Sequence, residues 1–257
     1  MYNCIVARAI GTKEGTFLYF ETVYTIDSRD LDCFDLCRAS ALLGYLQDAA
    51  GLAAGQFGAT NLDMVRKYGH CWMVVRTGYT LERPLHWGDQ LSIKTWHRGG
   101  DKPLMFRDFE LSVDGQTVGQ ALSIWTLVDL TDHSLTRADR FPEFAGTDGG
   151  ALNRTTKLAK LKLPADLSLI QERALHYSDT DGNGHVNNVR YADFLCDAAD
   201  LQAAPPGTFV KSLHIDYLQE CKAGEALSLL GCQADDGFYV QGRDSRGEAR
   251  FQGRMTL

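Results

Sequence analysis

The chain has 257 residues, of which 44% are hydrophobic and 23% are charged, a composition typical of a globular protein with a sizeable core. Its net charge of −7 argues against a nucleic-acid partner, because such binding requires a dominant basic face. No apolar run approaches the roughly 18 residues of a spanning helix, and Met1 to Gly15 lacks a signal-peptide pattern, so we expect neither a membrane span nor secretion.

The first predicted helix begins at Ala39 and ends near Ala54. It is apolar on nearly every face, so we expect it to be buried. Runs rich in β-forming residues follow it in the first half of the chain, at Met73 to Leu81, Gln90 to Trp96, Met105 to Val113 and Val118 to Asp129.

A turn-rich, basic segment then separates the two halves. Between Asn153 and Pro164 it holds four basic residues and no acid: Arg154, Lys157, Lys160 and Lys162. We expect an N-terminal domain over 1–145, an interdomain linker over 146–168 and a C-terminal domain over 169–257.

A second helix is predicted from Asn188 to Ala199, with Tyr191 and Phe194 on its apolar face and Asn187 or Asn188 suited to cap its start. β-rich runs follow it at Phe209 to Leu218, Ala226 to Gln233, Phe238 to Arg243 and Ala249 to Leu257. The two halves thus repeat one order of elements, and both carry a Gly-acid-x-Leu turn, at Gly88 and Gly224. Consecutive strands beside one apolar helix favour an α+β fold with antiparallel sheets.

The second half carries two segments that resemble the active site of the acyl-ACP thioesterases: Ser178-Asp179-Thr180-Asp181-Gly182-Asn183-Gly184-His185-Val186-Asn187-Asn188-Val189-Arg190-Tyr191 and Tyr217-Leu218-Gln219-Glu220-Cys221. The first half resembles the N-terminal repeat of that family at Leu46-Gln47-Asp48, Trp87-Gly88-Asp89, Thr95-Trp96, Arg107-Asp108 and Ser123-Ile124-Trp125. The resemblance implies a tandem (double) hot-dog fold, in which each half is a curved antiparallel sheet around a long helix, without metal or organic cofactor.

The resemblance also implies an activity, the hydrolysis of fatty acyl-ACP to free fatty acid, which ends chain elongation. The first-half counterpart of the motif, Asp27 to Phe34, lacks a Gly-His-x-Asn-Asn sequence, so we expect catalysis in the second half only.

Seven cysteines without a CxxC pair favour free thiols in the cytoplasm. The start of the chain almost at its first strand points to a bacterial-type version without the plastid extension of the plant enzymes.

The resemblance implies that five residues line the catalytic site: Asp181, Asn183, His185, Glu220 and Cys221. Thioester hydrolysis needs an attacking group, a proton carrier and donors for the oxyanion. Glu220 and Cys221 are adjacent in a predicted strand, so both can face the site only at a strand end or a bulge. We favour Asp181 and Glu220 as the principal groups, because a thiol with a pKa near 8.5 would need strong depression to attack. Whether Cys221 or a carboxylate-activated water attacks is left open.

The acyl chain needs an apolar wall, for which the candidates are Leu42, Leu46, Ala49, Trp72, Val74 and Tyr79. Acyl carrier protein is strongly acidic, so the four linker cations, Arg154, Lys157, Lys160 and Lys162, are its candidate docking surface. Two alternatives are an acyl-CoA thioesterase and a non-catalytic acyl-binding or dehydratase-like hot-dog protein. Homodimer formation is also left open.

Overall fold

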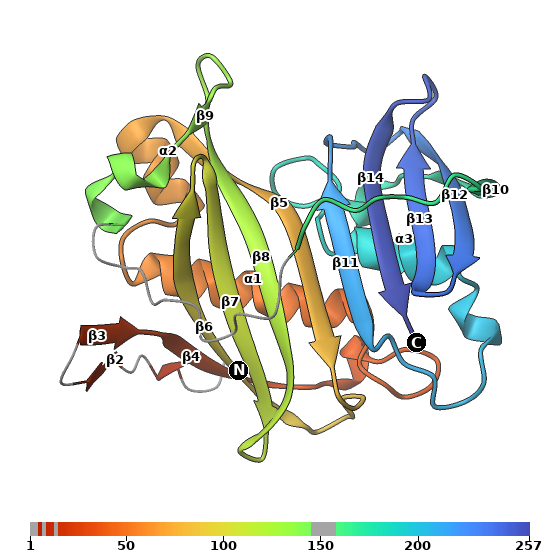
Figure 1. The fold of residues 1–257 in the computed structure, drawn as a ribbon, viewed down its shortest axis with the longest axis horizontal. Helices are drawn as coiled ribbons and strands as arrows, with labels where there is room; N and C mark the ends of the chain where they lie inside the picture. Colours follow the sequence, from red (N-terminus) through yellow and green to blue (C-terminus); the bar gives the residue numbers. More distant parts are fainter. Residues whose placement is uncertain (1–4, 7–8, 13–14, 145–157) are drawn as a thin grey trace. The chain divides into compact units, whose positions relative to one another are not determined.

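The computed structural model describes residues 5–6, 9–12, 15–144 and 158–257, and its chain divides into two compact units (Figure 1). Unit 1 comprises Met1–Ile26, Gly44–Thr77 and Gly88–Leu158. Unit 2 comprises Asp27–Leu43, Gly78–Trp87 and Ala159–Leu257. Two short segments of the first half therefore belong to the same compact unit as the second half. The predicted domain boundaries remain a prediction.

Unit 1 is built on an antiparallel sheet that explains the alternating runs of the first half. Its strands lie in the order β1-β4-β6-β7-β8-β5, and β9 pairs with β8. The last residues of β5, 78–81, belong to unit 2. The bounds are β1 (Ile5–Val6), β4 (Phe20–Thr25), β5 (His70–Leu81), β6 (Gln90–Asp101), β7 (Leu104–Val113), β8 (Gln116–Asp129) and β9 (Leu135–Thr136). A separate hairpin joins β2 (Ala9–Thr12) and β3 (Gly15–Leu18). The four runs predicted in this half are confirmed as the strands β5 to β8.

The first helix, α1 (Ala39–Gly55), begins at the predicted residue. Its side chains Leu42, Leu46 and Ala49 are buried, as expected, whereas Leu52 is 38% exposed. The expectation of a helix buried on nearly every face is therefore wrong for its last turns, where the helix reaches solvent.

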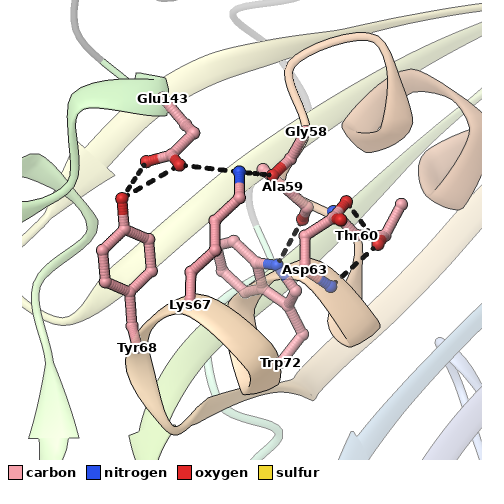
Figure 2. Close-up of polar contacts among 8 residues, drawn as sticks. All are labelled: Gly58, Ala59, Thr60, Asp63, Lys67, Tyr68, Trp72 and Glu143. Carbon is pink, nitrogen blue, oxygen red and sulfur yellow. Dashed lines mark hydrogen bonds and ion pairs between the residues drawn. The ribbon is translucent and has the colours of Figure 1, made fainter.

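A short helix that the sequence analysis did not predict, α2 (Asn61–Tyr68), covers a second apolar cluster of unit 1 that contains Met64, Met105 and Phe141. Figure 2 shows how α2 is fixed: its start is capped by Thr60 and Asp63, and its end is tied to the turn Pro142–Phe144. The carboxylate of Glu143 accepts hydrogen bonds from Lys67 Nζ (3.1 Å) and from the Tyr68 hydroxyl (3.0 Å). These contacts explain why eight residues suffice for a stable helix, since tertiary packing supplies what helix propensity cannot.

Unit 2 contains the strand order β11-β14-β13-β12-β10, all antiparallel. The bounds are β10 (Ser168–Ala174), β11 (Ser212–Tyr217), β12 (Ala226–Ala234), β13 (Gly237–Arg243) and β14 (Ala249–Thr256). The helix α3 (Arg190–Ala198) packs on β11 and β14, where Gly253 leaves room for Leu195. The predicted strands of this half are confirmed.

The second helix begins two residues later than predicted. The Asn187 side chain accepts a hydrogen bond from the Val189 amide (3.2 Å), so it binds the chain just ahead of Arg190, the first helical residue. None of the helices in the described part of the chain has the length and apolarity that crossing a bilayer requires.

Candidate active site

The motif loop before α3 is a tight, hydrogen-bonded turn. The Asp181 amide donates to the His185 carbonyl (2.9 Å), and the Gly184 amide donates back to the Asp181 carbonyl (3.0 Å). The Asp181 carboxylate accepts the Asn183 amide at 2.8 Å. Gly184 has φ +77°, a left-handed conformation that favours glycine. The glycines of the motif therefore give a defined turn rather than a loose one.

The turn brings His185 to the carboxylate of Glu220. His185 Nε2 lies 3.2 Å from Glu220 Oε2, and the two side chains are 30% and 51% exposed. Both groups are therefore within reach of a substrate and of water. Glu220 lies three residues beyond β11, which ends at Tyr217.

Cys221, next to Glu220 in the chain, lies in the core. Its side chain is fully buried, and burial raises the pKa of its thiol. The thiol interacts electrostatically with the Tyr191 hydroxyl, while the Cys221 carbonyl accepts the Val186 amide (2.8 Å) and so joins the two motif segments. Burial also raises the pKa of Tyr191 far above its ordinary value. A neutral, buried thiol is poorly suited to nucleophilic attack.

Aromatic side chains pack around Tyr191, the last residue of the first motif segment. The Tyr191 ring contacts the rings of Phe194, Tyr217 and Phe251 at centroid distances of 4.8–5.6 Å. The Tyr217 hydroxyl donates to the Asn188 carbonyl (3.1 Å) and thereby anchors the chain at the end of the motif. The helical spacing predicts Tyr191 on the apolar face of the helix, but no local pattern indicates its interaction with Cys221.

The first half contains a structural copy of the motif loop that keeps the aspartate but lacks the asparagine and the histidine. The Asp32 amide donates to the Leu36 carbonyl (2.8 Å), and the Asp32 carboxylate accepts the Phe34 amide (2.8 Å), as Asp181 does with His185 and Asn183. The residue at the position of Gly184 is Asp35, whose backbone is also in the left-handed conformation, with φ +59°.

The match extends to the second segment of the motif. The Cys37 amide donates to the Leu85 carbonyl (2.8 Å), as the Val186 amide does to that of Cys221. The copy therefore has Leu36 in place of His185, and Leu85 and its neighbour Pro84 in place of Cys221 and Glu220. Only the aspartate is shared, which assigns to Asp181 a loop-shaping role alongside any chemical one.

A pocket of about 670 Å³ lies in unit 2 beside this first-half loop. Its walls include Asp32, Cys33 and Arg38 of the loop and Asp193 and Cys196 of α3. The five predicted catalytic residues do not line it. In the described part of the chain, no group of three or more His, Cys, Asp or Glu side chains has a metal-binding arrangement.

The structure places the five predicted catalytic residues unequally. It joins His185 to Glu220, leaves Asn183 exposed, half-buries Asp181 and buries Cys221. An arginine that the sequence analysis did not single out, Arg250, binds the Glu220 carbonyl through Nη1 (3.0 Å). No local signal could have found it, because it lies 30 positions along the chain, on β14.

The predicted acyl-chain wall falls in both units. Leu46, Ala49, Trp72 and Val74 belong to unit 1, and Leu42 and Tyr79 belong to unit 2. Leu42, Leu46, Ala49 and Tyr79 are buried, whereas Trp72 and Val74 are half-buried. Whether any of them lines an acyl tunnel remains a prediction.

The basic linker is described only in part. Arg154 and Lys157 lie outside the described residues, and Lys160 and Lys162 are exposed. Leu161, between the two lysines, donates its amide to Asp216 Oδ2 (2.8 Å), and its carbonyl accepts Gln252 Nε2 (3.0 Å). Asp216 and Gln252 are buried, so this part of the linker is anchored to the sheet of unit 2.

Comparison with known proteins gives matches over most of the chain. Residues 18–140 match the "Acyl-ACP thioesterase N-terminal domain" and residues 164–248 match the "Acyl-ACP thioesterase C-terminal domain". A chloroplastic palmitoyl-acyl carrier protein thioesterase of Gossypium hirsutum is 27% identical over 85% of this chain and 56% of its own length. A dodecanoyl-[acyl-carrier-protein] hydrolase of Cinnamomum camphora is 28% identical over 83% of this chain and 59% of its own length. The chain thus spans little more than half the length of these curated relatives.

Solved structures confirm the predicted fold. An acyl-ACP thioesterase from Bacteroides thetaiotaomicron has a TM-score of 0.75 at 18% identity, and a 12:0-ACP thioesterase from Umbellularia californica has a TM-score of 0.76 at 22% identity. Each alignment covers 92% of this chain and 96% of the other. With both domain models matched in order and the tandem α+β hot-dog fold in place, the chain belongs to the acyl-ACP thioesterase family.

Proposed function

We propose that this protein hydrolyses the thioester of fatty acyl-ACP and releases a free fatty acid. The observation that carries the proposal is the 3.2 Å contact between His185 Nε2 and Glu220 Oε2, formed by two segments that both belong to the family motif. A carboxylate and an imidazole in contact, both partly exposed, are groups that can move protons to and from a bound thioester and water.

In the proposed reaction, a water molecule attacks the thioester carbonyl carbon through its oxygen, and Glu220 takes a proton from that water. The new carbon–oxygen bond gives a tetrahedral oxyanion, which an amide or imidazole donor stabilises; Asn183 and His185 are the candidates. The oxyanion then collapses, the carbon–sulfur bond breaks, and the departing pantetheine sulfur takes the proton through His185. Asp181 holds the turn that presents Asn183 and His185.

The carrier is proposed to dock at the basic linker. Lys160 and Lys162 flank an anchored residue and are exposed, so they present positive charge at a defined place on an otherwise acidic chain. Such a surface favours encounter with an acidic partner more than it strengthens the final complex. For the acyl chain, α1 remains the proposed wall. The cytoplasmic location stays a prediction.

Hydrolysis by the purified protein tests the proposal. Acyl-ACP and acyl-CoA of several chain lengths are compared, with release of the thiol as the signal. We expect hydrolysis of acyl-ACP, and at least about 100-fold lower turnover in Asp181→Ala and His185→Ala with the fold intact, the size of effect typical of lost acid–base or orienting groups. Near wild-type turnover in either variant would refute the site. Faster hydrolysis of acyl-CoA would instead indicate an acyl-CoA thioesterase. Hydrolysis of neither substrate would favour a non-catalytic acyl-binding protein.

A further inference from the structure

The segment that carries Glu220 is held by one residue of the neighbouring strand. Beyond the end of β11, the amides of Leu218 and Gln219 both donate to the Arg250 carbonyl at 3.0 Å. The guanidinium of the same residue donates from Nη1 to the Glu220 carbonyl, also at 3.0 Å. Three consecutive residues are therefore bound to Arg250, just before the Cys221 carbonyl is bound to Val186.

The guanidinium of Arg250 is itself held by an ion pair with Asp244. Its Nη2 atom donates to Asp244 Oδ2 at 2.7 Å, and the two side chains are only 13% and 8% exposed. Asp244 Oδ1 accepts the amides of Arg246 and Glu248 at 2.9 Å, so the carboxylate is locked into the turn between β13 and β14. The guanidinium therefore cannot rotate without breaking a buried ion pair.

We propose that Arg250 is a positioning residue, which sets the carboxylate of Glu220 against His185 through the backbone of Glu220. This inference rests on the proposed function, since it assigns Arg250 to the same reaction. Arginine is suited to the task because its planar fork binds a carboxylate and a carbonyl at the same time, whereas a lysine ammonium is a single point of charge on a flexible stem. The inference does not require Arg250 to touch the substrate.

Arg246 provides a matched control. It also reaches Asp244 Oδ2, from Nε at 3.4 Å, but its side chain is 73% exposed. Arg246 contacts Asp244, and in the described part of the chain no hydrogen bond or ion pair joins it to residues 218–221. Arg250→Lys and Arg246→Lys therefore make the same chemical change on two neighbours of one carboxylate, only one of which holds Glu220.

The kinetic test compares these variants with Glu220→Gln. We expect Arg250→Lys to lower kcat by about 10- to 100-fold with KM nearly unchanged, because a small misplacement of a catalytic group has an effect of that size. Arg246→Lys should keep wild-type kcat. In the double variant Arg250→Lys/Glu220→Gln, the loss should equal that of Glu220→Gln alone, because Arg250 acts only through Glu220. Additive losses would overturn the proposal.

A second readout does not depend on activity. Hydrogen exchange followed by mass spectrometry should show faster exchange in the peptide containing residues 218–222 in Arg250→Lys and no change in Arg246→Lys. Unchanged exchange in Arg250→Lys would overturn the positioning role, even if hydrolysis by the wild-type protein is established. Conversely, faster exchange supports the role even if the substrate proves to be different. If Arg250→Lys does not fold, Asp244→Asn serves instead, because it removes the ion pair of the Arg250 guanidinium and keeps the arginine. It should give the same local increase in exchange.

Discussion

Cys221 is buried with Tyr191 inside the core of unit 2, whereas the residue before it, Glu220, reaches His185 at the surface. Two adjacent side chains thus lie in different surroundings, one in the core and one at the surface. This arrangement gives the two residues different access to solvent, because the Glu220 side chain is 51% exposed and Cys221 is buried.

We expect Cys221→Ala to keep measurable hydrolysis and Glu220→Ala to lose most of it. The reason is that the thiol is buried, which raises its pKa, while the carboxylate is half-exposed beside His185. Turnover of acyl-ACP by the two purified variants is the measurement. A covalent acyl-enzyme trapped on Cys221 would reverse this order and make the thiol the nucleophile.

Alkylation should show the same difference without any substrate. Burial raises the pKa of the Cys221 thiol, so at pH 7 it is neutral, and iodoacetamide should modify it at least about tenfold more slowly than the exposed Cys33. Mass spectrometry of the digested protein measures both rates. In urea the difference should disappear, because unfolding exposes both thiols. Equal rates in the native protein would show that Cys221 is accessible.

Gly184 should tolerate some side chains and reject others. Its left-handed backbone strains most residues by about 1–2 kcal/mol, yet Asp35 holds the same conformation in the first-half copy. We expect Gly184→Val to lower Tm and activity, and Gly184→Asn to keep the fold, because Asn and Asp adopt this conformation most readily. Gly182→Ala is the control, since Gly182 does not have a left-handed φ. If Val and Asn behave alike, backbone strain is not what selects glycine here.

The Asp244–Arg250 pair should make stability depend on pH in the acid range. Burial raises the pKa of Asp244, but hydrogen bonds from the Glu248 amide and the Arg250 guanidinium outweigh it and hold that pKa at about 2. A carboxyl with a lowered pKa stabilises the fold fully above its unfolded value, near 4, and loses this contribution as pH falls towards 2. The Tm difference between wild type and Asp244→Asn should therefore be largest at neutral pH and shrink below pH 4.

Asp235→Asn, a change at an exposed acid in the turn between β12 and β13, serves as the control for this pH series. It should leave Tm close to that of wild type throughout. A Tm difference for Asp244→Asn that stays constant from pH 7 to pH 2 would contradict the assignment.

The linker lysines should matter only for the intact carrier. Changing Lys157, Lys160 and Lys162 together to Glu should lower kcat/KM for acyl-ACP by roughly one to two orders of magnitude, since a repulsive surface slows the encounter with an acidic protein. A small pantetheine thioester should be hydrolysed as before, and the effect should fade above about 0.1 M salt. Equal losses for both substrates, or none for either, would place the docking surface elsewhere.

The sequence by itself was sufficient for the features that depend on short stretches of chain. Strands follow from two-residue patterns and α1 follows from its apolar run, so β5 to β8 and β11 to β14 lie where they were expected. The motif around His185 was recognisable because its spacing is local. The helix α2 was missed although Thr60 and Asp63 form a capping box, because a helix of only eight residues depends on its tertiary contacts.

Only the tertiary structure decided how the motif residues are oriented. The side to which Cys221 points could not be derived from strand alternation, because β11 ends at Tyr217 and alternation holds only within a strand. The hydrogen bonds between Arg250 and residues 218–220 depend on the register of β11 against β14, in which Tyr217 is paired with Phe251. Register is set by packing across the whole sheet, so residues 30 positions apart acquire a common role that no local pattern records.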